Sequence, residues 1–152
     1  MNNLTELINE LETKITHREK TNNTVSDASV GWHIHHSQLV VLQIILALER
    51  SNPESYRWKF NLNRFFVYTL NKIPRGRGKA PESVKPKEQA DAAKMNKTFE
   101  ILKARLPLLD ALQPNNYFKH PYFGDLNVKA AIKMLKIHTK HHIDIVNDII
   151  RS

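Results

Sequence analysis

Three histidines, His138, His141 and His142, lie within the C-terminal stretch KMLKIHTKHHIDIVNDII. The stretch has the pattern of an amphipathic helix, and His138 and His142 fall one turn apart on its apolar stripe. Two imidazoles at this spacing can reach a single ion, whereas a buried imidazole without a partner costs free energy. The pair therefore indicates a metal site, although one such histidine alone is more often a hydrogen-bonded core residue.

A second histidine cluster, His33, His35 and His36, lies in the stretch VGWHIHHSQLVV. His36 precedes an apolar stripe at helical spacing, so it too can point inward. One histidine from this cluster and two from the C-terminal stretch would make a three-nitrogen site with open coordination positions, as in catalytic metal sites. The chain has no cysteine, so a transition-metal site must use His, Asp or Glu.

Four further residues are candidate substrate contacts, each with a structural alternative. Gln43 lies two turns beyond the second cluster and either lines a pocket or bonds a backbone carbonyl. His120 precedes a proline, where it either touches substrate or caps a turn. Arg75 and Arg77 lie in a loop rich in proline and glycine, Pro74–Pro86, which either closes over an anionic substrate or is simply solvated. No residue stands out as a general acid or base.

Apolar residues at helical spacing predict the elements that must position these side chains. A short helix is favoured at 62–70, where a strand is the alternative, and a loop is expected at 113–127. We predict that Pro107 ends or kinks the third long helix. The four long helices are expected at 3–18, 30–50, 87–106 and 127–150, the last with Asn127 as its N-cap. These elements predict one all-α domain over residues 1–152, a four-helix bundle.

Composition agrees with a globular chain, since 41% of its residues are hydrophobic and 25% are charged. The N-terminus does not resemble a secretory signal, and the most apolar stretch, LVVLQIILAL, is too short to span a bilayer. We therefore expect a cytoplasmic protein with no membrane partner. A net charge of +8 could attract nucleic acid or an anionic substrate, or serve only solubility. Exposed apolar residues on the second and third long helices could pair two copies into a homodimer.

The segments SVGWHIHHSQ (29–38) and HPYFGDLNVKAAIKMLKIHTKHH (120–142) together resemble the DinB/YfiT-like metalloenzyme superfamily. The resemblance covers most of the chain in helix order. It implies an up-down-down-up four-helix bundle that holds a divalent metal, usually zinc, nickel or iron. Matched motif by motif, the ligands would be His36, His138 and His142. The family motif places its histidine at the end of an S-V-x5-H run, which selects His36 over His33 and His35.

The resemblance implies a small-molecule substrate, which could be a low-molecular-weight thiol. Characterised relatives are transferases or isomerases that use bacillithiol or mycothiol, and they usually show H-R-G-Q after the last ligand. Here Ile143, Asp144 and Ile145 follow that ligand, and the branch that the chain most resembles has no settled activity. Two reaction classes therefore compete: metal-assisted transfer of a thiol to an electrophile, and metal-assisted hydrolysis.

A function of another class is a basic, non-catalytic binding module in which the metal site is vestigial or structural. It would bind nucleic acid or an acidic partner through PRGRGK (74–79) and the lysine face of the last helix. The loop lacks aromatic residues for base stacking, and the lysine face is the expected solvent side of an amphipathic helix. Nucleic acid is therefore the less favoured partner.

Overall fold

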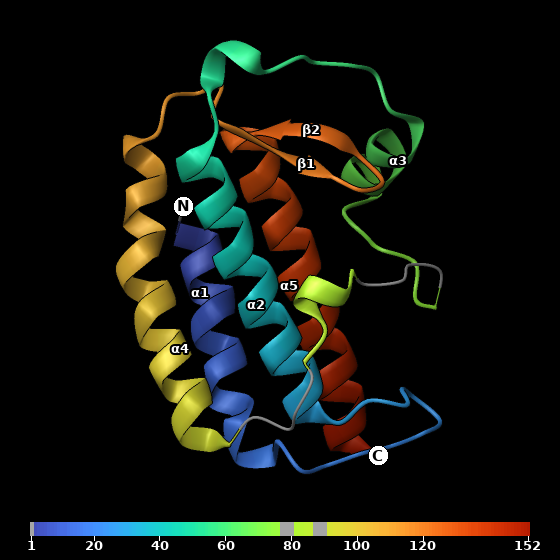
Figure 1. The fold of residues 1–152 in the computed structure, drawn as a ribbon. Coiled ribbons are helices and arrows are strands. Elements are labelled where there is room, and N and C mark those ends of the chain that lie inside the picture. The colour runs from blue at the N-terminus through green and yellow to red at the C-terminus, as the bar shows by residue number, and fades with distance from the viewer. Residues whose placement is uncertain (1, 77–80, 87–90) are drawn as a thin grey trace.

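The fold is mostly helical in the computed structural model, which describes residues 2–76, 81–86 and 91–152 (Figure 1). The four long helices are α1 (Asn2–Glu12), α2 (Val30–Arg50), α4 (Ala92–Arg105) and α5 (Val128–Arg151). They lie side by side, and α1 and α5 run opposite to α2 and α4 (Figure 1). Helix α2 contacts α4 and α5, and α1 contacts the same two helices. The core fills the space between their apolar faces, where Leu4, Ile34, Phe99, Leu102 and Leu135 are fully buried.

Side-chain caps fix where three of the long helices begin. The Ser29 hydroxyl accepts the Trp32 N–H at the start of α2, and Asp91 accepts the Lys94 N–H at the start of α4. The predicted N-cap of α5 is confirmed, since the Asn127 side chain accepts the Ala130 N–H at 3.1 Å. Each cap satisfies a backbone donor that the first helical turn leaves free.

The ends of two predicted helices differ from expectation in the structure. The first α-helix ends at Glu12 instead of residue 18 and continues as the 3-10 helix η1, Thr13–His17. The third long helix becomes the 3-10 helix η4, Leu106–Ala111, where Pro107 removes a helical donor as predicted. Its predicted start at Lys87 lies outside the described residues. The short helix favoured at 62–70 is confirmed as α3, Leu62–Leu70.

The all-α prediction is wrong in one place, because the expected loop 113–127 contains a two-stranded antiparallel sheet. Strand β1, Tyr117–His120, pairs with β2, Gly124–Asn127, and Phe118 lies opposite Leu126. Leu126 is fully buried, so the hairpin covers the start of α5 and contributes to the core.

The proline-rich loop also contains regular structure that its composition did not predict. Residues Glu82–Val84 form the 3-10 helix η3, which contacts α2. Val84 is buried there, so this segment is part of the packed interior. A further 3-10 helix, η2, spans Pro53–Ser55 after α2.

No helix in the described part of the chain is long and apolar enough to cross a membrane. Among the large apolar side chains, those with the highest exposed fractions lie in α3 and the segment before it: Trp58, Phe60, Leu62, Phe65, Phe66 and Leu70.

Candidate metal centre

The three histidines expected to bind metal come together between α2 and α5. His36 lies in the second turn of α2, and His138 and His142 lie one turn apart in α5. One ring nitrogen from each histidine can be chosen so that all three atoms lie within 4.8 Å of one another. The centroids of the His138 and His142 rings are 4.5 Å apart, and the His36 ring is 4.8 Å from that of His142. The predicted convergence of these rings is therefore present in the structure.

The orientation of His36 leaves one of its nitrogens free to bind an ion. Its Nδ1 lies 2.7 Å from the carbonyl oxygen of Val84 in η3. A carbonyl can only accept, so Nδ1 carries the proton and Nε2 has the lone pair. Trp32 stacks on a face of the ring, with centroids 4.9 Å apart and an interplanar angle of 12°. These two contacts hold Nε2 toward α5.

The position of His138 also suits a shared ion. Its Nε2 lies 3.2 Å from the Nε2 of His36. Metal–nitrogen bonds of about 2.0–2.1 Å at tetrahedral or octahedral angles place two ligand nitrogens roughly 2.8–3.4 Å apart. The buried Nδ1 of His138 has no hydrogen-bond partner among the described residues. This Nδ1 stays unpaired whether His138 Nε2 donates to His36 or binds an ion, so the fit to a cation rests on the separation of the two Nε2 atoms.

His142 is held by a residue that the prediction had set aside. Its Nδ1 lies 2.9 Å from the Nδ1 of His33, which is buried in the first turn of α2. The other nitrogen of the His33 ring, Nε2, lies 3.0 Å from the hydroxyl of Ser26. This hydroxyl also accepts the Ala28 N–H at 3.2 Å. His142 thus has an outer partner, and its Nε2 is not engaged by this chain of contacts.

Burial keeps the histidines of the centre neutral. It lowers the pKa of His36, and it lowers the pKa values of His138 and His142 well below their usual range. Burial, aided by neighbouring positive charges, lowers the pKa of His33 to about 4. Metal binding requires neutral imidazole, so protons do not compete strongly for these nitrogens near neutral pH.

Two of the candidate substrate contacts have structural partners. Gln43 donates from Nε2 to the carbonyl of Ser83 at 2.6 Å, so it holds η3 in place, as its structural alternative predicted. His120 lies in β1, where its Nδ1 accepts the N–H groups of Tyr122 and Phe123 at 3.1 and 3.2 Å. The turn-capping alternative therefore describes part of its role.

The His120 ring is enclosed by its neighbours in the hairpin. Its ring stacks on Phe123, with centroids 4.2 Å apart, and burial lowers its pKa to about 4. Burial is the main cause of the lowered pKa of His138, and a positive charge on His120 would lower it further. Because Nδ1 accepts two N–H groups, the neutral His120 ring carries its proton on Nε2.

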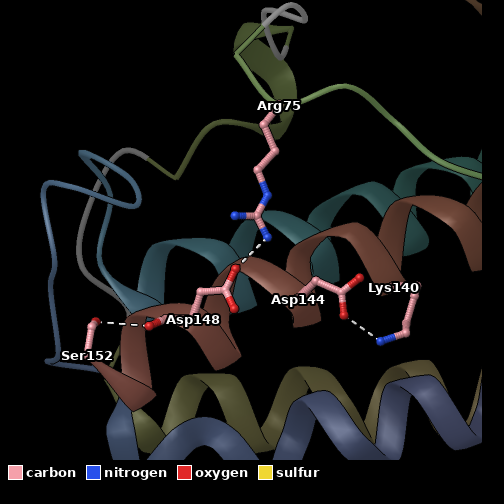
Figure 2. Close-up of polar contacts among 5 residues, drawn as sticks. All are labelled: Arg75, Lys140, Asp144, Asp148 and Ser152. Carbon is pink, nitrogen blue, oxygen red and sulfur yellow. Dashed lines mark hydrogen bonds and ion pairs between the residues drawn. The ribbon is translucent and has the colours of Figure 1, made fainter.

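The two arginines are placed differently. Arg75 forms a 2.8 Å ion pair with Asp148 of α5 (Figure 2). It lines a cavity of about 780 Å³ that also includes His141. The structure does not bring it into contact with the three histidines, although its charge lowers the pKa of His33. Arg77 lies outside the described residues.

Sequence reasoning missed three parts of this centre: His33 as the partner of His142, Ser26 as the partner of His33, and the Val84 carbonyl. One signal was present for the first, because His33 lies three residues before His36 and so shares its helix face. Nothing in the pattern around residue 84 indicates a backbone acceptor for a histidine.

No protein-family model matches this chain, and no curated protein or solved structure matches it. Membership of the DinB/YfiT-like superfamily therefore stays a prediction that rests on the two sequence motifs.

Proposed function

We propose that the chain is a metal-dependent enzyme in which His36, His138 and His142 bind one divalent transition-metal ion. The observation that carries the proposal is the 3.2 Å approach of two Nε2 atoms, of which the one on His36 bears a lone pair. Three imidazoles suit zinc, nickel and iron alike. When bound, such an ion would act as a Lewis acid that polarises a substrate or lowers the pKa of a water or thiol.

The surrounding residues would orient the ligands and the substrate. The Val84 carbonyl fixes the His36 tautomer, and His33 is placed to accept the Nδ1–H of His142. Partners of this kind hold ligand rings in position and raise their basicity. His120 carries a proton on Nε2, and its charge would influence the pKa of His138, so we propose that it donates a hydrogen bond to a substrate oxygen.

The helix directions support the DinB/YfiT-like assignment. Helices α1 and α5 run opposite to α2 and α4, which is the order of an up-down-down-up four-helix bundle (Figure 1). Under this assignment the reaction is the transfer of a low-molecular-weight thiol to an electrophile, or a hydrolysis. A homodimer also stays a prediction.

Metal content tests the proposal directly. Untagged protein is purified and analysed for zinc, nickel and iron, beside a His138→Ala, His142→Ala double variant. His17→Ala is the matched control, because His17 lies in η1 and is not one of the three candidate ligands. We expect about one ion per chain in the parent and the control, and little in the double variant. If all three proteins lack metal, and added metal does not raise the melting temperature of the parent, the proposal is wrong.

A panel of thiols separates the two reactions. The metal-loaded protein is mixed with a reactive electrophile, with and without each thiol. A rate that requires both metal and thiol supports transfer. Turnover of ester or amide substrates that requires metal alone supports hydrolysis.

A further inference from the structure

A second candidate site adjoins the histidine centre without sharing its ligands. The cavity of about 780 Å³ lies between residues 71–75 and the C-terminal half of α5, from Ile137 to Arg151. Its size is within the range of small-molecule sites. His141 lines it, and the His141 ring centroid is 5.2 Å from that of His142. A ligand in this cavity would therefore lie one imidazole ring away from the proposed metal ligands.

The charges that line the cavity favour an anion. Four cationic side chains and two carboxylates line it: Lys72, Arg75, Lys140, Arg151, Asp144 and Asp148. Both carboxylates are paired, Asp144 with Lys140 and Asp148 with Arg75 (Figure 2). Lys72 and Arg151 form no ion pair with any residue in 2–76, 81–86 or 91–152. The lining thus has an excess of two positive charges.

The ion pair between Arg75 and Asp148 is one that a ligand can replace. The two side chains are 46% and 43% exposed, and exposed pairs contribute only about 0–1 kcal/mol. The contact runs from a single guanidinium nitrogen, Nη2, to one carboxylate oxygen. An anion with two oxygens in one plane could accept two N–H groups from Arg75, which is a stronger arrangement.

The segment that carries Arg75 has attachments other than this ion pair. Burial lowers the pKa of His141, and the backbone of Ile73 lies near enough to the ring to oppose part of that shift. Asn71 ends α3 in the left-handed conformation, with φ 48°, so the chain turns there toward α5. Arg75 can therefore change partner without release of the whole segment.

We propose that this cavity binds the anionic group of a small molecule, and that Arg75 exchanges Asp148 for the ligand. Carboxylates and phosphates share this chemistry. The idea that this anionic group anchors a substrate rests on the proposed function. Binding of the anion in the cavity does not, because it does not require the metal.

Binding is measured by isothermal titration calorimetry on the full chain at low ionic strength, after metals have been removed with a chelator. The probes are inorganic phosphate and succinate, with uncharged succinamide as the control ligand. Asp148→Asn removes the competitor for Arg75, and Asp110→Asn removes one exposed acid outside the cavity. Lys72→Gln, Arg151→Gln removes the two unpaired cations, and Lys97→Gln, Lys129→Gln removes two exposed cations elsewhere.

Asp148→Asn is expected to tighten anion binding about fivefold, the factor that corresponds to about 1 kcal/mol. Asp110→Asn should change it less than about twofold, because a distant exposed charge is screened. The cavity double variant should weaken binding about tenfold, more than the control pair does. Tighter binding of phosphate than succinate would assign a phosphate ester as the ligand class, and the reverse a dicarboxylate.

Several outcomes would overturn the anion site: no binding of either anion, no tightening in Asp148→Asn, or equal losses in the two double variants. The two proposals fail separately. A chain that binds anions here but no metal refutes only the enzyme proposal, and a chain that binds metal but no anion refutes only this one.

Discussion

The Nδ1 atoms of His33 and His142 lie 2.9 Å apart, although 109 residues separate them in the sequence. One of the two must carry the proton. If His142 donates, His33 can donate in turn from Nε2 to Ser26, and the Nε2 lone pair of His142 stays available to an ion. If His33 donates instead, His142 must hold its proton on Nε2, where a metal would have to displace it. His33 is therefore a positioning residue for the proposed centre.

Replacement of His33 should weaken metal binding while the fold is kept. We expect His33→Ala to lower metal affinity by about 10–100-fold, as is typical when the outer partner of a ligand is lost. Affinity is measured by competition with a chromophoric chelator, and circular dichroism checks the fold. His35→Ala is the matched control, since His35 lies in the same helix but outside the three-histidine set. Equal affinities in the two variants would show that His33 does not position His142.

Gln43 should act on the centre through η3. Gln43→Ala removes the hydrogen bond to Ser83, next to the Val84 carbonyl that orients His36. We expect a loss of about 1 kcal/mol in the free energy of unfolding, measured by urea denaturation. Metal affinity should fall a few-fold in the same variant. The control is Gln113→Ala, an exposed glutamine side chain, and a loss of similar size there would argue against a specific role for Gln43.

Gly31 is expected to be intolerant of even a methyl group. A Cβ at this position would lie 2.9 Å from the carbonyl oxygen of Arg18, which also accepts the Gly31 N–H at 2.8 Å. In an open helix Gly→Ala stabilises by about 1 kcal/mol. Here the close approach of α2 to the chain after η1 should reverse the sign, with a loss of about 1–3 kcal/mol in Gly31→Ala. The free energy of unfolding is measured by urea denaturation. A gain in Gly31→Ala would show that α2 and the chain at Arg18 move apart easily.

His120 should make stability depend on pH. Its pKa falls from 6.5 to about 4 on folding, because burial disfavours the charged ring. Below pH 6.5 the unfolded chain binds a proton at His120 that the folded chain does not bind. The contribution of the neutral His120 to the free energy of unfolding is therefore complete above pH 6.5 and is lost as the pH falls toward 4.

The test compares the parent with His120→Gln by urea denaturation from pH 7.5 to 4.5. The free energy of unfolding should fall less steeply in the variant, by up to about 1.4 kcal/mol per pH unit. Parallel curves would contradict a buried neutral His120.

Local periodicity explains which parts of the molecule could be predicted. His138 and His142 share a face because a helix repeats every 3.6 residues, and that repeat is visible within α5 alone. Asn127 was also predictable as a cap, because a cap and the helix that it begins are adjacent in the sequence. The choice of His36 among three neighbouring histidines required the family motif.

Contacts between distant segments account for what was missed. The Val84 carbonyl reaches His36 across 48 residues, and no pattern around Val84 specifies that partner. The hairpin was missed because its strands have only four residues each and contain no clear alternation of apolar and polar side chains. Part of its stability comes from Leu126, which is buried in contact with distant parts of the core.

His36 contacts η3 through Nδ1 and would bind the ion through Nε2, so a change at one nitrogen of the ring affects the other. An ion that withdraws electrons at Nε2 would make Nδ1–H a stronger donor to Val84, so loading of the centre should tighten η3 against α2. The coupling is reciprocal: if the ion strengthens the packing of η3 by a given factor, loss of that packing lowers the affinity for the ion by the same factor. Digestion with a glutamate-specific protease would then report whether the centre holds an ion. Cleavage after Glu82 should be slower when the ion is bound, and the cleaved chain should release the ion.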